Sequence, residues 1–380
     1  MRACDRSRVG DGTCADRSGT SSARKGAPTS VILDTDMWGD IDDMLALAGL
    51  HALQERGEAK ILAITSSMAD KWTASYIDAL DTFYGHANIP VGLVRDGVVP
   101  PAQWSGDGVP MAAGAQMYTQ YVSNLRKPDG SFVFPHRLVD GSKAENPVQL
   151  LRRTLAAQAD GSVVMIGIGF STNFARLLDS KPDRYSSLDG TELVKRKVKL
   201  LSVMAGRFAD ETYGGETLHK DRPEYNIRKD IPSAKRLFER WPTPIVVSGS
   251  EIGFTMRIKG SDIESKFNYV QNHPVVVTYR YMDQTYRTGA TANAALHDHK
   301  TFDLTAVLYA IRPNDGYFSL SPAGRLIVGP TGLATLDEST GGNTRHLILD
   351  DAQRSRVLEA MTLLASEPPP TISRKANSKQ

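Results

Sequence analysis

Cysteine is almost absent from this 380-residue sequence, and its two cysteines, Cys4 and Cys14, lie close to the N-terminus. The folded body therefore has neither a disulfide scaffold nor a thiolate metal site. No apolar run approaches the roughly 20 residues that a membrane-spanning helix needs. The net charge is only +2, and no lysine- or arginine-rich run stands out. We therefore expect neither a nucleic-acid nor a membrane partner.

The first 29 residues also lack the apolar core, about 7–15 residues long, of a secretory signal. They are rich in Ser, Arg, Gly, Asp and Thr, so residues 1–29 are predicted to be a disordered tail. Residues 30–366 are predicted to form the folded domain, and residues 367–380, which begin with a proline run, a second disordered tail. We expect a cytoplasmic protein, or a periplasmic or secreted one if the start codon is wrongly assigned.

Short buried runs alternate with amphipathic stretches along the folded part, whose composition is that of a globular protein. Strands are expected at 31–33, 59–66, 90–94, 162–168, 198–204 and 244–247, and helices at 44–56, 72–84, 116–125, 147–158, 172–178, 232–241, 304–311 and 352–364. This alternation predicts one α/β, Rossmann-like domain with an open, mostly parallel central sheet flanked by helices. Residues 317–349 predict a small added β-hairpin, and residues 275–281 fit either a strand or a helix.

Residues 95–146 interrupt the alternation and are rich in Gly, Pro and Asp. A long irregular insertion in a compact domain is either a functional flap or a surface excursion. Its side chains that could close over a ligand are Trp104, Phe132, Phe134 and His136.

Five aspartates crowd the loop between the first strand and the first helix, in the sequence DTDMWGDIDD. They are Asp34, Asp36, Asp40, Asp42 and Asp43. The carboxyl end of a strand is where open α/β sheets bind ligands. So many like charges raise one another's pKa unless a cation neutralises them, and all-oxygen ligation favours Ca²⁺ or Mg²⁺.

Three interpretations of this loop compete. It could be a solvated acidic loop whose carboxylates cap the following helix. It could be an EF-hand, but Leu45 stands where that motif requires Glu, and a strand precedes the loop. We favour the third interpretation, a catalytic metal site.

Further motifs follow in order: ILAITSSMAD, VVMIGIGFSTNFA, LLSVMAG, PEYNI and FDLTAVLYAI. With the acidic loop they resemble the inosine-uridine-preferring nucleoside hydrolase family from Val31 to Ile311. The family's opening motif, DxDxGxDDA, is one residue shorter than the loop here. The resemblance implies hydrolysis of the N-glycosidic bond of a ribonucleoside or related riboside, as in purine or pyrimidine salvage. It also implies a homodimer or homotetramer.

The resemblance further implies a metal site. Ca²⁺, less favourably Mg²⁺, would be held by Asp36, Asp43, Asp303 and the backbone carbonyl of Ile168. Ile168 replaces a threonine of the family, which leaves the carbonyl unchanged. Asp36 would also be the general base that takes a proton from water. Asp303 opens a predicted helix and could instead be a plain N-cap.

For the sugar, the resemblance implies that Asp42, Glu224 and Asn226 bind ribose hydroxyls, which both donate and accept hydrogen bonds. Glu224 and Asn226 could instead be ordinary turn residues, and Asp42 could simply occupy the first helical turn. Asp70 stands where the family usually has Asn. It can accept a hydrogen bond from a hydroxyl but cannot donate one, so its role stays open.

Phe302 is the chief departure, because inosine- and pyrimidine-cleaving members have a histidine there. Phenylalanine cannot protonate a leaving base. A proton could come instead from solvent or from His297, His299, Tyr281 or Tyr286. The ring of Trp38 or of Phe302 could stack on the base.

Two other functions stay open. A haloacid-dehalogenase-like Mg²⁺ phosphatase would use Asp34 as nucleophile and Asp36 as acid. A non-catalytic, calcium-dependent sugar-binding protein would keep the pocket without a proton donor, as Phe302 suggests.

Overall fold

A central sheet of eight strands organises the computed structural model, which describes residues 26–99, 116–286 and 295–370. Cys4, Cys14, Trp104 and most of both predicted tails lie outside the described residues. The strand order is β11-β14-β8-β5-β4-β1-β2-β3. The strands are β1 (Thr29–Thr35), β2 (Ala59–Met68), β3 (Val91–Val98), β4 (Val163–Gly167), β5 (Val198–Met204), β8 (Ile245–Ser248), β11 (Ser319–Leu320) and β14 (Thr344–Ile348). All pairs are parallel except β11 with β14, which confirms the predicted fold class.

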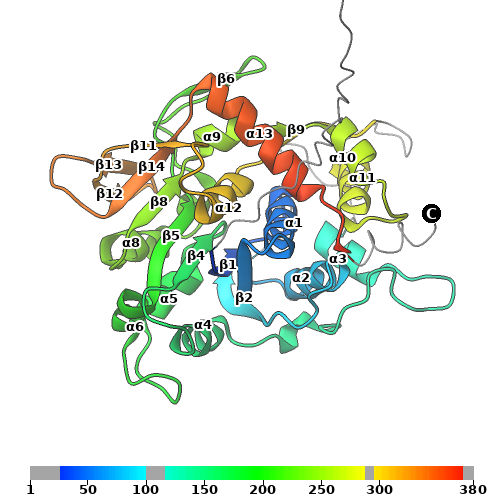
Figure 1. Cartoon of the computed structure of the whole chain (residues 1–380), viewed down its shortest axis with the longest axis horizontal. Helices are drawn as coiled ribbons and strands as arrows, with labels where there is room; N and C mark the ends of the chain where they lie inside the picture. Colours follow the sequence, from blue (N-terminus) through cyan, green and yellow to red (C-terminus); the bar gives the residue numbers. More distant parts are fainter. Residues whose placement is uncertain (1–25, 100–115, 287–294, 371–380) are drawn as a thin grey trace, which may run out of the picture.

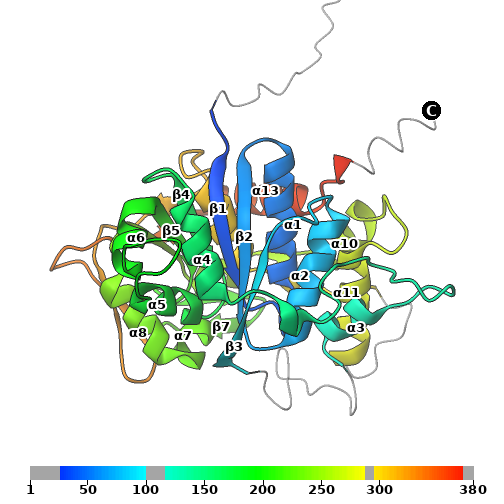
Figure 2. The same ribbon diagram turned by 90° about the horizontal axis from the view of Figure 1, so that it is seen from below.

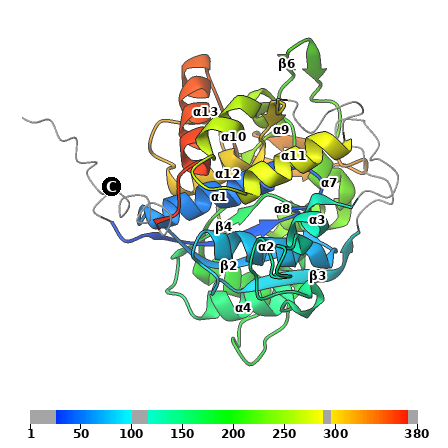
Figure 3. The same ribbon diagram turned by 90° about the vertical axis from the view of Figure 1, so that its right-hand side faces the viewer.

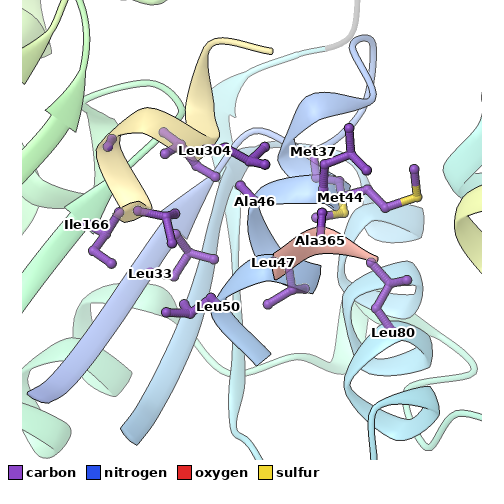
Figure 4. Close-up of a cluster of buried hydrophobic side chains, with 14 of the residues drawn as sticks. Leu33, Met37, Met44, Ala46, Leu47, Leu50, Leu80, Ile166, Leu304 and Ala365 are labelled. Atoms are coloured by element: carbon purple, nitrogen blue, oxygen red, sulfur yellow. The ribbon is translucent and has the colours of Figure 1, made fainter. Parts of the chain in front are cut away.

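Helices cover both faces of this sheet (Figure 1). One core takes α1 (Asp42–Glu55), α2 (Lys71–Phe83), α11 (Pro274–Tyr286), α12 (Asp303–Ile311) and α13 (Asp351–Ala365). The other takes α4 (Pro147–Ala156), α5 (Thr172–Asp179), α6 (Gly190–Lys197) and α8 (Ile231–Arg240). On β1, Leu33 belongs to the first core and Ile32 to the second, so the strand must be apolar on both faces. Figure 4 draws Leu33 together with Leu47, Leu50 and Leu304, which belong to the same core.

Smaller elements complete the fold. They are α3 (Tyr118–Asn124), α7 (Tyr225–Lys229), α9 (Ser250–Thr255), α10 (Gly260–Lys266), a 3₁₀ turn (Gly141–Lys143), and the strand pairs β6 (Glu211–Tyr213) with β7 (Glu216–Leu218), β9 (Arg257–Ile258) with β10 (His299–Lys300), and β12 (Arg325–Val328) with β13 (Ala334–Asp337). The predicted C-terminal hairpin is β12–β13, and it forms a sheet of its own. The edge of the central sheet is instead extended by β14 and β11.

The run that fitted either strand or helix lies in α11. Val275 and Tyr279, four residues apart, are both fully buried in the first core, so packing on one helical face outweighs the β-branched composition. Figure 3 shows α11 beside α3, where the rings of Tyr281 and Tyr121 stack with centroids 3.8 Å apart.

The described part of the insertion packs against α2. Asp78 accepts hydrogen bonds from the backbone N–H groups of Arg137 and Leu138. Phe134 is buried in the first core, whereas the Phe132 ring lies 3.4 Å from the Arg126 guanidinium. Phe134 is therefore part of the core, whereas Phe132 packs on a residue of the insertion itself. Among the helices of the described residues, we find none that could span a membrane.

Candidate active site

The site is built at the carboxyl ends of the parallel strands, toward the lower edge of Figure 2, where α7 also lies. Asp34, on β1, accepts hydrogen bonds from Thr65 Oγ1 (2.5 Å) and Asn173 Nδ2 (2.7 Å). Burial raises the pKa of Asp34 to about 7, against the effect of these hydrogen bonds. The backbone N–H of Ile168 donates to the Asp34 carbonyl (2.8 Å). Asp34 therefore ties β1, β2, β4 and α5 together.

Three buried carboxylates form a compact group: Asp42, Asp43 and Asp303 each offer an oxygen within 4.8 Å of the others. Asp42 and Asp43 open α1, and Asp303 opens α12. Burial, and then the charge of Asp43, raise the pKa of Asp42 to about 7. Burial and neighbouring aspartates also raise the pKa of Asp43 and of Asp303 well above the ordinary value.

Hydrogen bonds fix this group in place. Asp42 Oδ2 accepts the backbone N–H groups of Phe302 (2.7 Å) and Asp303 (3.2 Å), which joins the start of α1 to the start of α12. Thr35 Oγ1 donates to Asp43 Oδ1. Asp42 and Asp43 are thus oriented by the two helix ends and by β1.

Asp36 is partly exposed and follows β1. Burial, then the charges of Asp42 and Glu224, raise its pKa, so both carboxylates lie near it. The compact group contains Asp42 and does not contain Asp36. It therefore shares Asp43 and Asp303 with the predicted ligand set but has Asp42 where that set has Asp36. A Cβ at Gly169 would collide with the Asp36 backbone nitrogen, so glycine is needed for the turn after β4 to approach Asp36.

Glu224 and Asn226 lie at the start of α7. Glu224 caps this helix by accepting the N–H groups of Asn226 (2.7 Å) and Ile227 (3.1 Å), and it also accepts the N–H of Gly206 (3.3 Å). Asn226 Nδ2 donates to the Ile168 carbonyl oxygen (3.4 Å). The PEYNI segment thus contacts the carboxyl ends of β4 and β5, and its predicted ribose contacts remain a prediction.

Asp70 and Trp38 interact with each other. Asp70 caps α2 by accepting the N–H of Trp72 (3.1 Å), and it accepts a hydrogen bond from the Trp38 indole. Trp38 is 3% exposed and packs against Met68 and Phe170. Both residues therefore have structural partners, beside the roles predicted for them in substrate binding.

Phe302 is partly exposed and lies against α9, where a Cβ at Gly253 would collide with it. Most of the candidate proton donors already have partners. His297 Nδ1 lies 3.1 Å from Asp283 Oδ2, His299 Nε2 lies 3.3 Å from Asp283 Oδ1, and Tyr281 donates to the Gln116 carbonyl oxygen (2.5 Å). The Tyr286 side chain lies outside the described ones.

The donor set suits a hard divalent cation. Every ligand atom on offer is a carboxylate oxygen, and the three carboxylates are buried side by side. Without a cation, ionising all three would be opposed by desolvation and by like charge. Ca²⁺ and Mg²⁺ take oxygen ligands of this kind. The residues present therefore fit a metal site.

The family model described as inosine-uridine preferring nucleoside hydrolase matches residues 31–364. A plant nucleoside hydrolase has a similar fold, with 17% identity, a TM-score of 0.58, and 90% of this chain and 100% of that chain covered. The purine-preferring ribonucleoside hydrolase from Gardnerella vaginalis is 16% identical, with a TM-score of 0.59, and the match covers 89% of this chain and 99% of that chain. The type III effector XopQ, in a complex with adenosine diphosphate ribose, is 15% identical, with a TM-score of 0.61, and the match covers 91% of this chain and 96% of that chain. No curated protein matches significantly.

Proposed function

Because the chain belongs to the inosine-uridine-preferring nucleoside hydrolase family, which hydrolyses N-glycosyl bonds, we propose that its substrate is a ribonucleoside or a related riboside. The products are the free base and the sugar. We further propose that the reaction depends on Ca²⁺, with Mg²⁺ less effective, and that Asp36 is the general base.

The buried group of Asp42, Asp43 and Asp303 carries this proposal. Asp43 and Asp303 would hold the ion, together with Asp36 and the Ile168 carbonyl. Asp42 is close enough to contribute an oxygen, although its Oδ2 already accepts two backbone N–H groups. When bound, the ion supplies a positive charge that makes a nearby water more acidic and offsets the charge of the carboxylates.

The chain's own residues would do the rest. Asp36, the partly exposed member of the acidic loop, takes the proton of the attacking water. N-glycosidic cleavage passes through a cationic, oxocarbenium-like sugar, and the surrounding carboxylates stabilise that charge. Glu224 and Asn226 orient the ribose. Phe302 provides an apolar wall, so the leaving base takes its proton from another group or from solvent.

The phosphatase alternative meets a specific difficulty. Its nucleophile would be Asp34, which is 1% exposed and already accepts hydrogen bonds from Thr65 and Asn173. A nucleophile must reach its substrate, and this carboxylate is buried.

The test is an assay of base and reducing sugar released from a panel of purine and pyrimidine ribonucleosides. The protein is assayed with Ca²⁺, after chelation, and as Asp36→Asn. We expect calcium-dependent release that the variant loses. Hydrolysis of a generic phosphate ester with Mg²⁺, and of no nucleoside, would favour the phosphatase. Ribose binding without turnover of any substrate would favour the sugar-binding protein.

A further inference from the structure

Four cationic side chains lie in or near α7: Arg207, Arg222, Arg228 and Lys229. None forms an ion pair with a carboxylate within the part of the chain that the structure describes. Elsewhere, buried arginines are paired, as Arg152 is with Asp183 and Arg312 with Glu58. Arg222, Arg228 and Lys229 are exposed, whereas Arg207 is partly buried. A partly buried cation without an ion pair beside a predicted substrate site requires an explanation, because desolvating a charge without a partner is costly.

Arg207 is the innermost of the four, and its position is fixed. It follows Gly206, whose left-handed φ of +70° turns the chain at the end of β5. Arg207 Nε donates to Ser250 Oγ (3.0 Å) and Nη1 to the His219 carbonyl oxygen (2.9 Å). Both acceptors are neutral, and within the described structure Nη2 has no hydrogen-bond partner. Arg207 is half-buried, and its guanidinium uses Nε and Nη1 for hydrogen bonds within the protein while Nη2 remains available to a ligand.

The acidic residues of the same region mostly have other partners. Glu216 pairs with Lys300 (3.2 Å) and Glu211 with Arg354 (3.7 Å). Asp230 caps α8 and accepts a hydrogen bond from Thr172. Glu224 is occupied by three backbone N–H groups. Burial lowers the pKa of Arg207, and Glu224 and Glu251 lie near enough to raise it, but neither of them forms an ion pair with it.

These cations lie on the sugar side of the proposed site. Glu224 accepts the N–H of Gly206, the residue before Arg207, and its charge acts on Asp36. The ring of Tyr225, between Glu224 and Asn226, has the Arg228 guanidinium 5.9 Å and the Lys229 ammonium 5.4 Å from its centroid. A ribose held by Glu224 and Asn226 would therefore have its substituents next to Arg207 and this cationic group.

We propose that the substrate carries a phosphate ester on its ribose, as in a nucleoside 5′-monophosphate, and that Arg207 binds this phosphate. The proposal rests on the proposed function and names the substrate class of the same site. A guanidinium suits the role because its planar donors match phosphate oxygens. Water cleaves the bond between the anomeric carbon and the base nitrogen. Its hydroxyl joins the sugar carbon, its proton goes to the base, and the phosphate ester stays intact.

The experiment compares kcat/KM for inosine and uridine with kcat/KM for their 5′-monophosphates. Wild type is set beside Arg207→Gln and beside Arg236→Gln, a control that removes an exposed arginine on α8. We expect wild type to prefer the phosphorylated substrates. Arg207→Gln should lower the ratio of phosphorylated to unphosphorylated kcat/KM by about ten- to a hundred-fold, the usual effect of a charge-assisted hydrogen bond. The control should keep the wild-type ratio.

A wild-type preference for unphosphorylated nucleosides, or an equal loss on both substrate classes in Arg207→Gln, would overturn the proposal. Calorimetric binding of ribose 5-phosphate and of ribose, with thermal unfolding as a folding check, separates this proposal from the proposed function. If no substrate is cleaved, the hydrolase assignment fails. Tighter binding of ribose 5-phosphate than of ribose, lost in Arg207→Gln, still supports the phosphate site, and equal binding contradicts it.

Discussion

At the scale of single residues, Asp43 lies where burial, like charge and a hydrogen bond from Thr35 meet. We expect Asp43→Asn to weaken Ca²⁺ binding at least ten-fold, because the site loses a charged ligand. Unfolding of the chelated variant should cost on the order of 1 kcal/mol more than that of wild type, since a buried like charge is removed. Calorimetry and urea unfolding measure the two effects. Unchanged calcium binding would contradict the assignment. The control is Glu359→Gln, at an exposed position on α13.

Glu251 predicts a pH-dependent stability. Burial raises its pKa to about 7 from an unfolded value of 4.5, so the folded state binds this proton more tightly. The stabilisation is complete below about pH 4.5 and is lost as pH rises through about 7. Glu251→Gln should therefore be more stable than wild type by about 2–3 kcal/mol at pH 8, and by much less at pH 5.

Urea unfolding of both proteins across this pH range measures the difference. The exposed Glu359→Gln on α13 should follow wild type at every pH. A stability difference between Glu251→Gln and wild type that does not change with pH would count against a buried, proton-binding Glu251.

At the scale of elements, α1 contains Gly49 in its interior, beside a small apolar cavity lined by Leu53, Leu308 and Leu364. A Cβ there would meet Leu364 Cβ at 3.8 Å, an ordinary contact. Glycine inside a helix costs roughly 0.5–1 kcal/mol relative to alanine. Gly49→Ala should therefore raise the free energy of unfolding by about that amount.

Gly190→Ala is the matched contrast. A Cβ at this first residue of α6 would collide with the Leu177 carbonyl oxygen, so this variant should be destabilised. Thermal unfolding of both variants decides the matter, and a destabilised Gly49→Ala would contradict the packing described around α1.

Much of this element structure could be predicted from the sequence, because buried runs such as β4 and amphipathic helices such as α8 carry their own periodicity. The β-branched run of α11 could not, since its conformation depends on which face of the helix is buried. In the site, the sequence alone predicts the cluster of aspartates that follows the first strand. The group of Asp42, Asp43 and Asp303 was not fully visible, because it joins residues some 260 positions apart along the chain.

Other contacts of the site could not be predicted because they join residues from distant segments of the chain. Asn173 lies in a recognised motif, yet its bond to Asp34 depends on the pairing of β1 with β4. Arg207 follows the LLSVMAG motif, and only the fold brings it beside Glu224. The only signal for Arg207 in the sequence is its position directly after the glycine that follows a predicted strand.

At the scale of the whole molecule, cation binding and folding should be linked. Burial raises the pKa of Asp42 to about 7, so the metal-free protein gains stability from protonating this group below about pH 3.8 and loses it as pH rises through 7. A bound cation reverses the balance by favouring the ionised form. Ca²⁺ should therefore raise the Tm more at pH 8 than at pH 5.5. Scanning calorimetry with and without chelator measures this, and a calcium effect that is equal at both pH values would contradict it.

The most direct measurement is a calcium titration of the chelated enzyme in which the initial rate of base release is recorded at each addition. We expect no release in chelator, a rate that rises and saturates as one ion binds per chain, and no such rise in Asp36→Asn. Full activity in the presence of chelator, or a calcium response that Asp36→Asn retains, would contradict a calcium-dependent reaction in which Asp36 is the general base.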